Sequence, residues 1–182
     1  MLVKKYMNFE KNLISNELEK KKIEVIRAGE LPDNLRGQLE ALNDKRLENI
    51  TINIVPDSLW TKGDQPTESE AERQLIYVKQ SYYESINNND EIAWLIHELA
   101  HCQKFLDLES LEDYEKSMRT LAFTDLKSEY SYPNNPIEQY AFTKQFEYLK
   151  KGGKSKEDIL EMLKEYYGEE DTPFFSRLLE KL

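Results

Sequence analysis

The chain contains two histidines, and they stand four residues apart in the segment His97-Glu98-Leu99-Ala100-His101. On an α-helix, residues four apart lie one turn above each other on the same face. Both imidazoles can therefore reach one metal ion, and Glu98 lies close enough to act on water at that ion. We interpret the rest of the chain as a scaffold for this turn of helix. The plainer interpretation is a pair of histidines that are solvated or hydrogen-bonded in a core.

The residues before this motif predict that its helix is buried. The Asn87–Asp90 segment is a turn and helix-cap signal, and the helix that follows is apolar on nearly all sides over residues 92–96. The imidazole nitrogens of two histidines buried with such a helix need partners, which favours a bound metal ion. Cys102 follows the second histidine but points about 100° away around the helix, so we expect a small buried apolar residue rather than a ligand.

Length and charge limit the classes of function. The chain has 182 residues, which fits a single domain, and its net charge of −10 argues against a nucleic-acid partner. No apolar stretch is long enough to span a membrane, and no secretory signal is visible. The single cysteine excludes an internal disulfide. We expect a cytoplasmic protein, or one of the host cytoplasm if it is encoded by a phage.

Hydrophobic periodicity predicts an α+β fold that is mostly helical, with a small β-sheet beside the motif helix. Strands are expected at residues 23–26, 50–55 and 74–79. Helices are expected at residues 5–22, 33–49, from 91 through the motif, and at 109–127, 137–150, 155–167 and 173–182. We interpret residues 57–72 as a mobile, variable loop in preference to a functional rim of the cleft. Within one domain over 1–182, we expect an N-terminal helix and strand (1–30), a core (31–151) and a C-terminal helical appendage (154–182).

A third metal ligand has to be a residue other than histidine, because both histidines are already used. Asp107 would be the third ligand in a metzincin-type motif whose third histidine is replaced by aspartate. The chain turn in that motif requires a glycine, and Lys104 stands at that position here. Glu138 is the better candidate because it lies in the first turn of a helix that begins at Pro136. Ala141, one turn further on, would let that helix cross close to the motif. The helix dipole alone would also favour Glu138, and Asp125 and Glu129 remain alternatives.

The two motifs together resemble the short gluzincin-type metallopeptidases. The segment 97–101 is followed by Tyr132-Pro133-Asn134-Asn135-Pro136-Ile137-Glu138-Gln139-Tyr140-Ala141. Small phage and bacterial zincins, and peptidase domains of the ImmA/IrrE type, share this layout over roughly residues 31–151 of the present chain. The resemblance implies a minimal zincin fold with zinc on His97, His101 and Glu138. The thermolysin-like aspartate four residues after the glutamate is absent, since Phe142 stands there.

The resulting expectation is a zinc-dependent peptidase that acts on a peptide or protein. Glu98 would be the general base, and a tyrosine would donate a hydrogen bond to the developing oxyanion. Tyr132 is our first choice for that donor, with Tyr130 and Tyr140 as alternatives. A second hypothesis is a zincin-fold binding or regulatory module without turnover, against which Glu98 argues. A third is a helical interaction protein without metal, whose C-terminal helices dock a partner.

Overall fold

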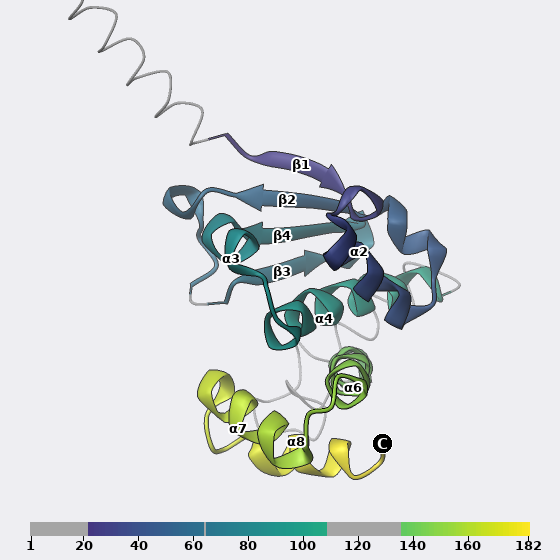
Figure 1. The fold of residues 1–182 in the computed structure, drawn as a ribbon, viewed down its shortest axis with the longest axis vertical. Coiled ribbons are helices and arrows are strands. Elements are labelled where there is room, and N and C mark those ends of the chain that lie inside the picture. Colours follow the sequence, from purple (N-terminus) through teal and green to yellow (C-terminus); the bar gives the residue numbers. More distant parts are fainter. Residues whose placement is uncertain (1–21, 64, 109–135) are drawn as a thin grey trace, which may run out of the picture.

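The computed structural model describes residues 22–63, 65–108 and 136–182. A four-stranded sheet, helix α4, helix α6 and the pair α7–α8 follow one another across the molecule (Figure 1). This arrangement is the α+β fold that the sequence predicts, with a small sheet beside the motif helix. The strands and helices, in chain order, are β1 (Glu24–Arg27), α2 (Asp33–Leu39), β2 (Thr51–Val55), β3 (Thr67–Glu70), β4 (Leu75–Lys79), α3 (Gln80–Ser85), α4 (Asn89–Leu106), α6 (Pro136–Lys151), α7 (Lys156–Tyr167) and α8 (Thr172–Leu179).

The sheet has the strand order β1-β2-β4-β3. Its two central strands, β2 and β4, are parallel, and each edge strand is antiparallel to its neighbour. The register pairs Ile52 with Ile76 and Ile54 with Val78, and all four side chains are buried. Alternating β-branched residues of this kind favour strands with one face in a core. The three strands expected from the sequence are therefore confirmed.

Strand β3 corrects the interpretation of residues 57–72 as a mobile, variable loop. Residues 67–70, Thr-Glu-Ser-Glu, pair with β4 and form an edge of the sheet. Only Thr67 of the four is buried, so the segment has no apolar alternation that could have identified it. The strand pairs with β4 through backbone hydrogen bonds, which do not depend on the side chains. An edge strand has only one such neighbour.

The helix predicted over residues 33–49 is also wrong in its extent. Helix α2 ends at Leu39, and two short 3-10 turns follow at Glu40–Leu42 and Lys45–Asn49. Asn43 interrupts the helix because it adopts the left-handed conformation, with φ 49°, which asparagine tolerates better than most residues. The Asp44 side chain then accepts a hydrogen bond from the Arg46 backbone N–H and caps the next turn.

Helix α4 runs through the middle of the fold and is buried along most of its length. Its first turn is capped by Asn88, whose side-chain oxygen accepts hydrogen bonds from the backbone N–H groups of Asp90 and Glu91 at 2.9 and 3.0 Å. On one side α4 packs against β3, and on the other it packs along α6. The buried helix and its cap are as the sequence predicts.

The C-terminal helices share the hydrophobic core of the rest of the described chain. The ring of Phe175 on α8 packs 4.9 Å from that of Phe142 on α6, and Ile159 and Leu163 of α7 are buried. Helix α6 begins at Pro136 and ends before the Gly152-Gly153 pair, as expected. The helices expected at 5–22 and 109–127 lie outside the described residues. None of the helices that the structure describes is long and apolar enough to cross a membrane.

Replacing the cap of α4 tests how the motif helix is anchored. Asn88→Ala removes the acceptor for two backbone N–H groups, so we expect the free energy of unfolding to fall by about 1 kcal/mol in urea denaturation. Asn87→Ala, at the exposed neighbouring position, is the matched control and should change it by less than about 0.5 kcal/mol. Equal losses in the two variants would contradict the capping role.

Candidate metal centre

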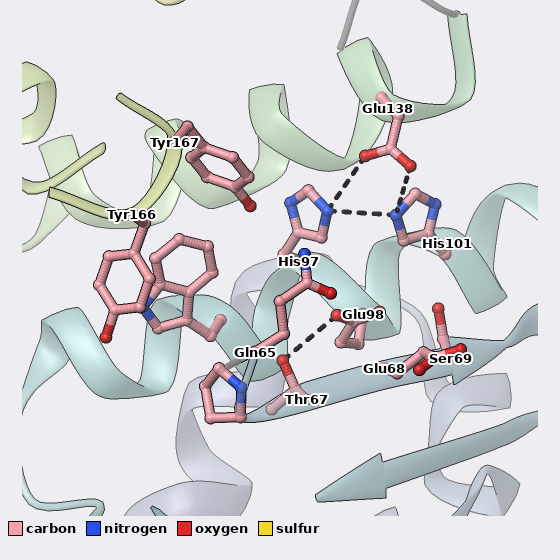
Figure 2. Close-up of a pocket in the computed structure, with 12 residues that line it drawn as sticks. Gln65, Thr67, Glu68, Ser69, His97, Glu98, His101, Glu138, Tyr166 and Tyr167 are labelled. Atoms are coloured by element: carbon pink, nitrogen blue, oxygen red, sulfur yellow. Dashed lines mark hydrogen bonds and ion pairs between the residues drawn. The ribbon is translucent and has the colours of Figure 1, made fainter. Parts of the chain in front are cut away.

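Three potential metal ligands converge between helices α4 and α6. The Nε2 atoms of His97 and His101 lie 3.1 Å apart. The two carboxylate oxygens of Glu138 face them, one 3.4 Å from Nε2 of His97 and the other 3.6 Å from Nε2 of His101. Figure 2 shows the three side chains directed toward one another. Both histidines are buried, and the cluster can hold a metal ion.

Glu138 reaches the histidines because α6 begins directly before it. The residue lies in the first turn of α6, and Ala141, one turn further along, is fully buried. A methyl side chain at that position allows the close helix approach that a short carboxylate ligand requires. Asp107, the alternative third ligand, instead pairs with Arg46 at 2.5 Å beyond the end of α4. Asp125 and Glu129 lie outside the described residues.

Gln145 orients the first histidine, and no pattern in the sequence marks it for this role. This residue lies two turns after Glu138 on α6, and its side-chain oxygen lies 3.2 Å from Nδ1 of His97. An amide oxygen only accepts hydrogen bonds, so the contact keeps a proton on Nδ1 and leaves Nε2 to face the cluster. Phe142, where the thermolysin-like signature has aspartate, packs edge-on against the His97 ring, with the two ring centroids 4.6 Å apart. The polar contact therefore comes from the next turn of α6.

The charges in the cluster favour a cation at its centre. Burial raises the pKa of Glu138, but the His97 contact and the charges of both imidazoles outweigh burial, so the pKa is lowered and the carboxylate stays ionised. Burial lowers the pKa of His97, and the Glu138 carboxylate more than offsets it, so that pKa is raised. For His101 burial dominates, and its pKa is lowered. A metal ion in the cluster would compete with a proton for Nε2 of His97.

Glu98 lies beside the cluster and is held by the edge strand. The Thr67 hydroxyl donates a hydrogen bond of 3.2 Å to the Glu98 carboxylate, and Thr67 is itself buried (Figure 2). A carboxylate fixed in this way, next to the metal ligands and still partly exposed, can take a proton from a water molecule. Strand β3 is therefore part of the site, and the functional interpretation of this stretch is the better one.

The cluster opens into a cavity of about 220 Å³. Residues 65–69 form one rim, and two neighbouring tyrosines at the end of α7, Tyr166 and Tyr167, form another together with Trp94 of α4. The C-terminal helix α7 thus contributes directly to the site. Spacing along the chain gave no signal for these tyrosines, because only the packing of α7 brings them there.

Among the expected oxyanion donors, Tyr140 does not reach the cavity. Its hydroxyl donates a hydrogen bond of 2.9 Å to the side-chain oxygen of Gln103. Tyr132 and Tyr130 lie outside the described residues. Cys102 is fully buried, and burial raises the pKa of its thiol to about 12, in agreement with the apolar role expected for it.

Comparison of the chain with protein-family models, with curated proteins and with solved structures gave no match. Function is therefore inferred from the residues of the site and their geometry.

Gln145→Leu tests the orienting contact. Without the acceptor for Nδ1–H of His97, we expect metal affinity to fall by about 10- to 100-fold, measured by competition with a chelator. Gln145→Glu keeps an acceptor of the same shape and should bind the metal at least as tightly as the wild type. Unchanged affinity in Gln145→Leu would show that Gln145 only fills space.

Proposed function

We propose that this protein is a zinc-dependent peptidase. The observation that carries the proposal is the convergence of His97, His101 and Glu138 with Glu98 placed beside them. A structural metal site has no need for a carboxylate that lies next to its ligands without being a ligand itself, whereas hydrolysis needs a base at that position. The resemblance to gluzincin-type metallopeptidases in the two motifs supports the same reaction class.

The donor atoms fit zinc better than other common ions. Two imidazoles and one carboxylate form one of the ligand sets of catalytic zinc sites, which leave a fourth position open. Two ligands at 2.0–2.1 Å from a tetrahedral ion are separated by about 3.3–3.4 Å. The observed separations of 3.1, 3.4 and 3.6 Å are close to that value. Magnesium and calcium prefer sites made of oxygen ligands.

Each residue of the site then has a defined task. Zinc held by the three ligands would act as a Lewis acid toward the substrate carbonyl and make water a stronger acid. Glu98, held by Thr67, takes the proton from the attacking water and passes it to the leaving amine. Gln145 holds His97 with Nε2 toward the ion.

A hydrogen-bond donor to the developing oxyanion completes the proposal. Tyr132 remains our prediction from the sequence. Among the described residues, Tyr167 is a second candidate, because it lines the cavity and its hydroxyl is directed toward His97 (Figure 2). Tyr167→Phe removes only the hydroxyl, so the loss would appear in kcat with little change in metal affinity.

Metal content and catalysis can be tested separately. Purified wild-type protein is expected to contain one equivalent of zinc, which raises its melting temperature, and His97→Ala should lose both the metal and that stabilisation. If the wild type binds no zinc and His97→Ala is equally stable, the proposal is wrong.

Glu98→Gln distinguishes a peptidase from a binding module that has no turnover. The amide cannot act as a base, so cleavage of a denatured protein substrate should fall by about 100-fold or more while zinc content stays at the wild-type level. Equal cleavage by Glu98→Gln and the wild type would exclude Glu98 as the base.

Glu138→Ala tests the third ligand. In this variant only the two imidazoles would remain as ligands, so we expect a large loss of zinc affinity. Circular dichroism should show that the fold is unchanged. Asp107→Asn, which alters the other carboxylate considered for this role, is the matched control and should bind zinc as the wild type does. The opposite pattern would move the ligand to Asp107.

A further inference from the structure

One wall of the cavity is aromatic. Trp94 lies one turn before His97 on α4, and the ring of Tyr166 packs against it in a tilted arrangement with centroids 4.5 Å apart. The ring of Tyr167 lies 5.9 Å from Trp94, and Pro66 lies on the facing rim. In Figure 2 the two tyrosines lie to the left of His97, and Glu68 lies to the right.

The exposed fraction of each ring distinguishes rings that are buried in the core from rings that a ligand can contact. Trp94 is 6% exposed, so the packing of α4 against α7 largely accounts for it. Tyr166 is 52% exposed although it packs against Trp94 and lines the cavity. A half-exposed ring at the mouth of a cavity gains from any apolar group that removes it from water.

The carboxylates around the cavity already have partners within the protein. Glu68 pairs with Lys62 at 2.7 Å, Glu98 accepts from Thr67, and Glu138 faces the two imidazoles. A cationic side chain of a ligand would therefore have to compete with Lys62 for Glu68 and with the two imidazoles for Glu138. The aromatic wall selects by apolar contact and ring stacking instead.

We propose that Trp94, Tyr166 and Tyr167 form a subsite for a large aromatic or apolar side chain next to the peptide bond that is cleaved. This inference rests on the proposed peptidase function. The wall lies beside His97, so a side chain seated on it is adjacent to the carbonyl that the water activated by Glu98 would attack. Tyr166 then determines specificity and is not itself a catalytic residue.

Binding of short peptides tests the subsite without requiring turnover. The chain has two tryptophans, so Trp60→Phe leaves Trp94 as the single tryptophan, whose emission is selectively excited to report on the wall. In that background, with Glu98→Gln to prevent cleavage, we would titrate acetyl-glycyl-phenylalanine amide and its alanine and lysine counterparts. The phenylalanine peptide is expected to bind about 10-fold more tightly than the alanine peptide.

Tyr166→Ala should reduce that preference to less than about threefold, because one face of the subsite is lost. Tyr83→Ala, a partly buried tyrosine on α3 that does not line the cavity, is the matched control and should retain the preference. Equal binding of the three peptides, tighter binding of the lysine peptide, or an unchanged preference in Tyr166→Ala would overturn the subsite.

Failure of the subsite and failure of the peptidase proposal give different results. Zinc binding and cleavage without selection of aromatic residues, read by sequencing the products of a peptide mixture, would retain the peptidase and reject the subsite. An aromatic preference in binding that persists in a protein without zinc or cleavage would retain the aromatic site and reject the peptidase.

Discussion

The close packing of α6 along α4 is the interaction on which the site depends. Helix α4 alone supplies two imidazoles on one face, which is an incomplete set of ligands. Helix α6 adds Glu138 in its first turn and Gln145 two turns later, on the side that faces α4. Ala141 and Phe142 lie between these two residues, and both are fully buried. The small Ala141 side chain lets the two helices approach each other, and the Phe142 ring fills the space between them. The same interface therefore holds the core together and builds the polar cluster inside it.

This arrangement places polar groups in a mainly apolar interior, which is unfavourable unless each group finds a partner. In the structure the imidazoles and Glu138 satisfy one another, and the Gln145 oxygen satisfies Nδ1 of His97. A bound cation would replace weak mutual contacts with coordination, so metal binding and folding stability should be coupled. The edge strand β3 and the tyrosines of α7 then complete the cavity from two other directions.

Much of this centre is predictable from the sequence because its signals are local. The capped, apolar motif helix and a proline-initiated helix that presents Glu138 both follow from short segments. Other members are set by tertiary packing. Strand β3 is polar and forms through backbone pairing, so no periodicity marks Thr67 as the partner of Glu98. Gln145 and Tyr166 reach the site only because α6 and α7 pack where they do.

X-ray absorption spectroscopy of the zinc-loaded protein is the decisive test of the centre formed by His97, His101 and Glu138. We expect one zinc ion with only nitrogen and oxygen neighbours, at about 2.0–2.1 Å, and outer-shell scattering from two imidazole rings. The second imidazole should disappear from the spectrum of His101→Ala. A sulfur neighbour, which would have to come from a cysteine or methionine, or a single imidazole in the wild type, would contradict the proposed centre.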